Sequence, residues 1–225
     1  MKILRLSLCL GTVLARFCAT AQGTFQNLDF EQAIDVPTYP GSPFIWTTDA
    51  FPGWTVYAGG GPQTEVARDG VLYAVAALAD TAPPSLVLDG NFSAILAGYG
   101  LVSVTAAIGQ SGVIPAGSES LRFLSLGQLS VSFAGHSLPL QVLGNGPNAS
   151  QIYGANISAY AGQYGQMLFQ AGPGGIYVLD NISFSSQAIP EPGAPSILGL
   201  GALVLSLWRR KRQPVLRRCT EEAGL

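Results

Sequence analysis

The sequence predicts an all-β protein, an antiparallel β-sandwich with one apolar helix before it and one after it. Within residues 22–189 no stretch keeps a helical period, whereas apolar and polar residues alternate with period two in several short runs. Glycine, proline and asparagine separate these runs at roughly regular intervals, which is typical of strands joined by turns. Only 11% of the residues are charged and 48% are hydrophobic, so disorder driven by charge is excluded.

Residues 1–21 have the order of a secretory signal peptide. Lys2 and Arg5 precede the apolar run 6–14, and Ala19-Thr-Ala21 supplies the small residues of a cleavage site. The alternative is an uncleaved anchor, but this apolar run falls well short of the about 20 residues that a membrane span needs. We therefore expect the first helix to be removed on export.

Residues 22–187 are expected to form the sandwich domain. Alternation with period two predicts its strands, which we place at 92–96, 102–105, 121–126, 129–133, 167–169 and 175–184. Trp54 follows Phe51-Pro-Gly53 and begins a further apolar strand, so we expect its ring to be part of the core.

A second apolar helix is predicted near the other end of the chain. The motif Pro190, Glu191, Pro192 precedes the apolar stretch 197–208, and a basic cluster follows, Arg209, Arg210, Lys211 and Arg212. Positive charge after an apolar helix favours the cytoplasmic side of a membrane. Twelve residues rise only about 18 Å as a helix, which is short for a bilayer core of about 30 Å. The alternative, a buried final helix of the domain, is disfavoured by the four cations and the prolines.

This order of features, over residues 188–212, resembles the PEP-CTERM sorting signal of Gram-negative bacteria. The resemblance implies an exosortase-type membrane transpeptidase as a partner and transient anchoring of the apolar helix in the inner membrane. It also implies delivery of the body to the cell envelope or to extracellular exopolysaccharide. The tail 213–225 is a departure, because such signals usually stop soon after the basic residues. Its two further arginines fit a cytoplasmic tail and leave open whether the helix is cleaved.

The body resembles the galactose-binding-like jelly rolls of carbohydrate-binding modules. Three segments carry the resemblance, in this order: Asn27-Leu-Asp-Phe-Glu31, Phe51-Pro-Gly-Trp-Thr55 and Leu179-Asp-Asn-Ile-Ser-Phe184. The resemblance implies a jelly-roll β-sandwich in which the first and last of these segments lie beside each other.

Asp180 is the acidic residue of the body most in need of a partner. Alternation along the predicted final strand places Asp180 on the same inward side as its apolar residues, which we expect to face the core: Ile176, Val178, Ile182 and Phe184. A buried carboxylate needs a cation or hydrogen-bond donors. The jelly-roll resemblance implies a structural calcium here, with Glu31 and Asp180 as ligands and Asp29 as a distant third, and oxygen ligands suit Ca²⁺. The alternative is an aspartate bonded to loop amides, with no metal or other cofactor.

The charge and cysteine content of the body exclude several kinds of function. Two arginines face ten acidic residues between residues 22 and 189, a net charge of −8, so a nucleic-acid partner is excluded. His136 is the only histidine, and the body has neither lysine nor cysteine, so a thiol or Schiff-base mechanism lacks its nucleophile. We predict no catalytic residues. A small glycoside hydrolase stays an alternative, and it requires two carboxylates to converge in a cleft.

Sugar recognition would use exposed aromatic rings flanked by polar groups. Besides Trp54, the body offers Trp46, Tyr57, Tyr99, Tyr153, Tyr160 and Tyr164. The last three lie among glycine and asparagine, so we expect them to be partly exposed. Packing in the core is the commoner role for each ring alone, and the sequence does not identify the ligand-binding residues.

The sequence therefore predicts a non-enzymatic, exported surface or extracellular-matrix protein that is sorted through a PEP-CTERM-type signal. A carbohydrate-binding, lectin-like module of the cell envelope is the first alternative, and the glycoside hydrolase is the second.

Overall fold

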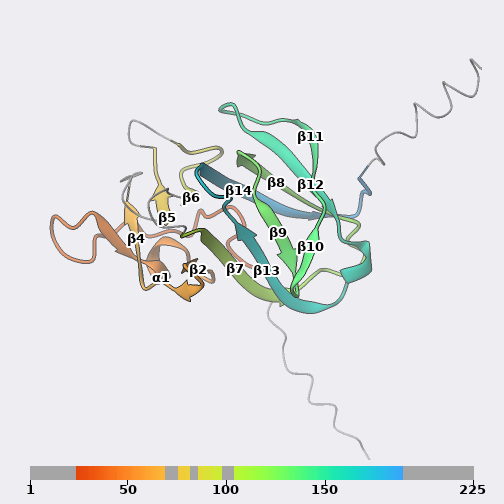
Figure 1. The fold of residues 1–225 in the computed structure, drawn as a ribbon, viewed down its shortest axis with the longest axis horizontal. Helices are drawn as coiled ribbons and strands as arrows, with labels where there is room; N and C mark the ends of the chain where they lie inside the picture. Colours follow the sequence, from red (N-terminus) through yellow and green to blue (C-terminus); the bar gives the residue numbers. More distant parts are fainter. Residues whose placement is uncertain (1–23, 69–75, 82–85, 98–103, 190–225) are drawn as a thin grey trace, which may run out of the picture. The chain divides into compact units, whose positions relative to one another are not determined.

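The computed structural model describes residues 24–68, 76–81, 86–97 and 104–189 (Figure 1). Their strands form two sheets, with the orders β1-β4-β5-β6-β14-β8-β12-β11 and β10-β9-β13-β7-β2-β3. Described neighbours pair antiparallel, except that β4 and β5 are parallel. The predicted all-β sandwich of the jelly-roll class is confirmed.

The eight-stranded sheet is built from β1 (Phe44–Trp46), β4 (Glu65–Arg68), β5 (Ala76–Ala79), β6 (Ser93–Ala97), β8 (Ser120–Leu126), β11 (Gln141–Asn145), β12 (Gln151–Asn156) and β14 (Ile176–Ser185). The six-stranded sheet is built from β2 (Thr55–Ala58), β3 (Gly61–Pro62), β7 (Ala106–Val113), β9 (Ser130–Phe133), β10 (His136–Leu138) and β13 (Tyr164–Gln170). Two short helices, α1 (Thr47–Ala50) and η1 (Ser158–Tyr160), lie in connections. None of the helices in the described part of the chain has the length and hydropathy of a membrane span.

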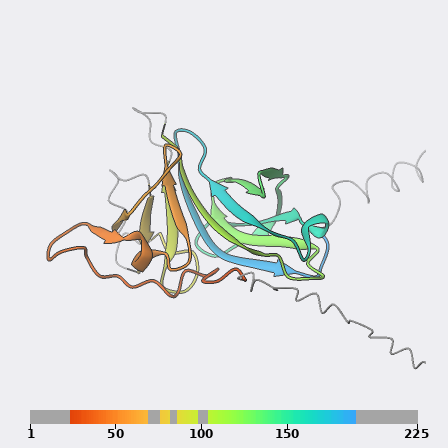
Figure 2. The same ribbon diagram turned by 90° about the horizontal axis from the view of Figure 1, so that it is seen from below.

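Most of the predicted strands are present. β6, β8, β9, β13 and β14 match the predictions, and β13 is longer than the three residues expected. The predicted strand at 102–105 falls partly outside the described residues, and β7 begins after it, at Ala106. Figure 2 shows β14, in blue, beside its neighbours in the sheet.

The main core lies between the two sheets and is rich in aromatic rings. Trp54 is 5% exposed, which confirms its predicted place in the core, and its ring lies 5.6 Å from Phe30 and 6.2 Å from Phe169. Phe123 joins this group and stacks on Tyr153, with the ring centroids 5.7 Å apart. Tyr153 is therefore only 4% exposed, so the expectation that it is partly exposed was wrong. Its strand β12 carries the ring to the core face of the sheet, which the polar sequence around it did not reveal.

A second apolar cluster lies on the opposite face of the eight-stranded sheet. Val178 of β14 faces Ile95 of β6, and both pack with Val87 and Leu88 of the segment that precedes β6. Asn148, in the turn between β11 and β12, donates from Nδ2 to the carbonyl of Val87 at 2.9 Å. This contact holds the 86–92 segment over the outer face of the sheet.

One sequence prediction about β14 was wrong, and a β-bulge is the reason. Asp180 pairs with Leu124 of β8 but Ser183 pairs with Arg122, so β14 has one extra residue at this point. Asn181, inside the bulge, has a φ of 47°. Ile176 and Val178 consequently belong to the outer cluster, whereas Ile182 and Phe184 belong to the main core. These four residues do not share one face, and Asp180 points outward with Val178, beneath the 86–92 segment.

Candidate functional site

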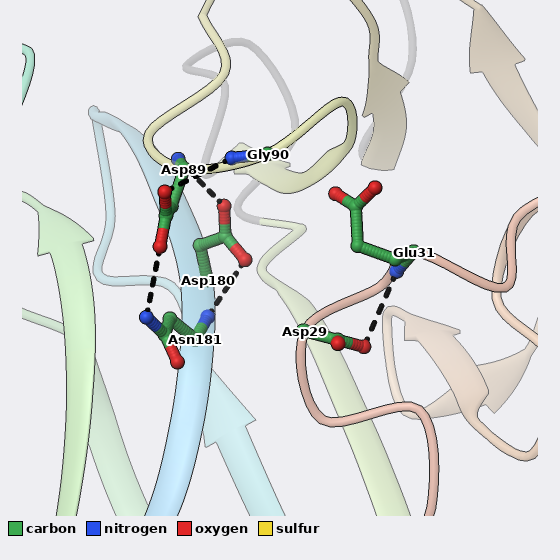
Figure 3. A pocket seen from close by; sticks show the side chains of 6 residues that line it. All are labelled: Asp29, Glu31, Asp89, Gly90, Asp180 and Asn181. Atoms are coloured by element: carbon green, nitrogen blue, oxygen red, sulfur yellow. Dashed lines mark hydrogen bonds between the residues drawn. The ribbon is translucent and has the colours of Figure 1, made fainter.

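Two hollows on the described surface carry polar side chains from several strands and loops. The first, which we call the carboxylate pocket, is lined by Asp29, Glu31, Asp89, Gly90, Asp180 and Asn181 and has a volume of about 210 Å³ (Figure 3). The second, the Tyr57 pocket, is lined by Tyr57, Gly60, Thr105, Ala107, Gln166, Leu168 and Gln170 and has a volume of about 230 Å³.

The first and last motif segments of the chain meet beside the carboxylate pocket, as the sequence predicted. The amide of Ile182 donates to the carbonyl of Leu28 at 2.9 Å, and the rings of Phe25 and Phe184 lie 5.3 Å apart. Trp54 donates from Nε1 to the carbonyl of Asn27 at 2.9 Å. These contacts fix the loop that carries Asp29 and Glu31.

The backbone conformation and hydrogen bonds of that loop account for its asparagine. Asn27 and Phe30 have φ values of 50° and 58°, and asparagine adopts this left-handed region more readily than most residues. The Asn27 side chain also donates to the carbonyl of Pro52 at 3.2 Å and accepts from the amide of Gln32 at 3.0 Å. Phe30 is fully buried, so the residues on either side of it, Asp29 and Glu31, are left at the rim of the pocket.

Glu31 binds the turn that leads into β6. Its carboxylate accepts hydrogen bonds from the amide of Asn91 at 2.7 Å, from Nδ2 of Asn91 at 2.8 Å and from the amide of Phe92 at 3.0 Å. Burial raises the pKa of Glu31, but the three donors outweigh burial and hold the pKa below its ordinary value. Glu31 is therefore an ionised side chain that joins the amino-terminal loop to the 86–92 segment.

Asp180 is 1% exposed and is supplied with donors by its surroundings. Oδ2 accepts from the Ser93 hydroxyl at 2.6 Å and from the amide of Asp89 at 3.1 Å, and Oδ1 accepts from the amide of Asn181 at 2.7 Å. Burial raises the pKa of Asp180 to about 6; the three donors oppose this rise and the nearby Asp89 carboxylate adds to it. Asp89 is bound in turn, since Nδ2 of Asn181 donates to it at 3.0 Å (Figure 3).

The carboxylate pocket brings together the residues that the sequence nominated for calcium. Glu31, Asp180 and Asp29 all line it, and sequence reasoning missed Asp89, Gly90 and Asn181. The Asp89-Gly90 turn before β6 was a visible signal, but only the folded chain places it against Asp180. Protein donors already engage both oxygens of Glu31, Asp89 and Asp180. In the described ranges no group of three or more His, Cys, Asp or Glu side chains is placed to hold a metal ion. This donor set favours the amide-bonded alternative over the calcium site, and a melting experiment with and without calcium tests the choice between them.

The Tyr57 pocket lies on the outward face of the six-stranded sheet. Ala107 of β7 forms its floor and pairs with Tyr57 of β2 on one side and with Gln170 of β13 on the other. In β13, Met167 and Phe169 point into the core, so Gln166, Leu168 and Gln170 point outward. This alternation was readable in the sequence around the predicted strand 167–169, but the pairing with β7 and β2 was not.

Two hydrogen bonds order the polar groups of the Tyr57 pocket. Gln166 donates from Nε2 to the Tyr57 hydroxyl oxygen at 3.0 Å, and Gln170 donates from Nε2 to the Thr105 hydroxyl oxygen at 3.2 Å. Each hydroxyl thus accepts from an amide and keeps its own proton for another acceptor, while the Oε1 atom of each glutamine is an acceptor.

The structure also locates most of the other candidate residues. Trp46 and Tyr164 are 45% and 51% exposed, and Tyr160 is half-buried against Phe133. Tyr99, the predicted signal peptide, the Pro190–Pro192 motif and the basic cluster 209–212 lie outside the described residues.

No family model and no curated protein matches the chain. Two solved structures are similar to it. One is TmCBM61, a carbohydrate-binding module in complex with beta-1,4-galactotriose, with 15% identity and a TM-score of 0.41 over 74% of this chain and all of that one. The other is the enzymatically active domain of tailspike protein 4 from bacteriophage CBA120, with 14% identity and a TM-score of 0.36 over 60% of this chain and 19% of that one. Likeness at this level says nothing about individual residues, so function has to follow from the chain's own pockets.

Proposed function

We propose that the protein is a non-catalytic carbohydrate-binding module that binds a glycan in the Tyr57 pocket. The observation that carries this proposal is the combination, in one open hollow, of an aromatic ring, an aliphatic side chain and hydrogen-bonding groups of both kinds. A sugar ring has the same combination, with apolar C–H groups on its faces and hydroxyls at its edge.

The apolar part of the pocket suits the face of a sugar ring. The Tyr57 ring, Leu168 and the small Ala107 are the apolar lining, and both Tyr57 and Leu168 are only half-buried. Aromatic and aliphatic surface that is partly exposed at the bottom of a hollow gains free energy when a ligand covers it.

The polar part of the pocket suits sugar hydroxyls, which both donate and accept. The hydroxyls of Tyr57 and Thr105 are available as donors, and the Oε1 atoms of Gln166 and Gln170 as acceptors. Because the glutamine amides already hold the two hydroxyls, less side-chain freedom is lost when a ligand binds.

The size of the pocket favours a polymer over an enclosed small molecule. Its volume of about 230 Å³ lies below the range of about 300 to 1,000 Å³ that is usual for small-molecule sites. The β13 segment from Gln166 to Gln170 spans about 13 Å, enough for about two to three sugar units of an extended chain. We expect part of a polysaccharide to lie across the sheet here.

Binding of oligosaccharides to the full chain, measured by calorimetry, tests the proposal. Tyr57→Ala should weaken binding about tenfold or more, because truncating a central aromatic contact typically costs at least about 1.4 kcal/mol. Tyr164→Ala is the matched control, since Tyr164 is on the same face of β13 but does not line the pocket; its affinity should stay unchanged. Equal losses in both variants, or no binding to any member of a panel that includes β-1,4-galactan, would contradict the proposal.

We further propose that this module works as an exported surface or matrix protein sorted by its PEP-CTERM-type carboxy-terminal signal. The support is the order of Pro190-Glu-Pro192, the apolar stretch and the basic cluster 209–212 in the sequence. Deleting residues 190–225 should release the protein into the growth medium, as measured by cell fractionation. Retention of the truncated protein in the cells would argue against sorting.

A glycoside hydrolase is a second candidate, because the carboxylate pocket meets the requirement that acidic side chains converge. Its two main carboxylates also have pKa values displaced in opposite directions, which is a pattern of acid and base pairs. Against this, Asp180 is buried and both carboxylates are held by protein donors. Release of reducing ends from a polysaccharide, abolished by Asp180→Asn in a folded variant, would favour the hydrolase.

A further inference from the structure

We infer that the Tyr57 pocket selects uncharged glycans and rejects those that carry carboxylate or sulfate groups. The inference rests on the proposed function, since it specifies the ligand class of the same pocket. It follows from where charged side chains are and are not found in this chain.

The six-stranded sheet contains no Asp, Glu, Lys or Arg in any of its described strands. The sequence shows how far this extends: residues 90–118 and residues 123–179 are free of these four residue types. The acidic residues that give the body its net charge of −8 lie in other segments of the sequence, so an acidic ligand meets repulsion from the body, and none of the described residues that line the pocket is an arginine or a lysine.

The two arginines of the body are both on the eight-stranded sheet. Arg68, at the end of β4, forms an ion pair with Asp35. Arg122, in β8, donates to the hydroxyl of Ser120 at 3.3 Å. Neither lines the Tyr57 pocket.

A carboxylate that enters the pocket would exchange hydrogen bonds to water for hydrogen bonds to uncharged protein groups only. Hydroxyl and amide donors can bind it, but without a cation they do not offset the cost of partly removing a full charge from water. A neutral hydroxyl at the same position meets the donors and acceptors that it needs. The difference in affinity should therefore depend on the charge of the sugar and not on its linkage.

Pairs of oligosaccharides that differ only in oxidation of the C6 hydroxymethyl to a carboxylate test this inference. The gluco, manno and galacto β-1,4 series supply such pairs, and calorimetry with the full chain gives their affinities. We expect the neutral member of any bound pair to bind about tenfold more tightly than its oxidised partner. We also expect its affinity to change little between about 0.05 and 0.5 M salt, whereas the oxidised member gains as salt screens the charge of the body.

A charge introduced at the pocket gives the converse test. Gln170→Lys places a cation in the lining of the pocket, at an exposed position, and removes the same hydrogen bonds for both members of a pair, so it should raise the affinity for the oxidised oligosaccharide relative to the neutral one about tenfold. Gln141→Lys, on the edge strand β11 of the other sheet, changes the net charge equally and should not.

The possible failures are distinguishable. If the oxidised members bind as tightly as the neutral ones, and Tyr57→Ala still abolishes binding, the inference is overturned while the proposed function stands. If Gln141→Lys and Gln170→Lys raise affinity for the oxidised members equally, only long-range charge is acting, and the selectivity does not belong to the pocket. If no member of any pair binds, the proposed function falls and the inference with it.

Discussion

Asp180 should make the protein less stable as the pH rises from about 4.5 to about 7, which is the opposite of ordinary acid denaturation. Its pKa is raised by burial to about 6 in the folded chain, against an ordinary value of 3.8. A group whose pKa is higher in the folded state binds its proton more tightly there, so folding is favoured while the proton is present. That stabilisation is lost as the pH rises through about 6.

The magnitude follows from the difference between the two pKa values. At 1.36 kcal/mol for each pH unit, a rise of the pKa from 3.8 to about 6 corresponds to about 3 kcal/mol over the whole titration. About two thirds of it, roughly 2 kcal/mol, falls between pH 4.5 and 7. For a domain of this size that is a fall in melting temperature of roughly 4 to 8 °C.

Glu31 does not obscure this window. Its pKa is below 4.5, so its contribution is present above that pH and is lost only as the pH falls further. Denaturant unfolding of the full chain at several pH values between 4.5 and 7 isolates the titration of Asp180.

The matched variants are Asp180→Asn, which cannot titrate, and Glu119→Gln, which removes an exposed carboxylate elsewhere. We expect the wild type and Glu119→Gln to lose about 2 kcal/mol across the window and Asp180→Asn to lose none of it. A wild type that gains stability on going to pH 7, or an Asp180→Asn variant that keeps the slope of the wild type, would contradict a raised pKa of Asp180 in the folded chain.

Two further predictions concern the carboxylate pocket. Gly60→Ala, at a reference glycine outside this pocket, should lower the free energy of unfolding by about 1 to 2 kcal/mol, because Gly60 has a φ of 84° and open space around it. Gly90→Ala should lower the free energy of unfolding by at least about 1 kcal/mol more than the reference substitution, because the new Cβ would also overlap the Glu31 carboxylate and break the hydrogen bonds of Glu31. If thermal unfolding shows equal losses of stability in the two variants, Glu31 is not held at this position. The melting temperature should be the same in millimolar calcium and in excess EDTA, because protein donors already engage the carboxylates. If calcium did bind, a free calcium concentration of about a hundred times the Kd would add about 2.7 kcal/mol to the free energy of unfolding. The resulting rise in melting temperature would restore the metal interpretation.

Several features could be predicted from local sequence. Period-two alternation was enough to predict the sandwich class and the positions of most of β6, β8, β9, β13 and β14. The reason is that the side-chain period of a strand is a property of the strand itself. The Phe51-Pro-Gly-Trp54 segment was enough to place Trp54 in the core. The need of Asp180 for donors also followed from local reasoning, since any buried carboxylate has that need.

The sequence by itself therefore determined the secondary-structure class, the absence of charge from residues 123–179 and the chemistry available at each motif. Only the tertiary structure decided which face Asp180 occupies, because one extra residue in β14 reverses the alternation at a bulge. It also decided that Tyr57 and Gln166, 109 positions apart in the chain, form one pocket. The physical reason is that strand pairing joins residues that are distant in sequence, and its register is set by packing against the whole core.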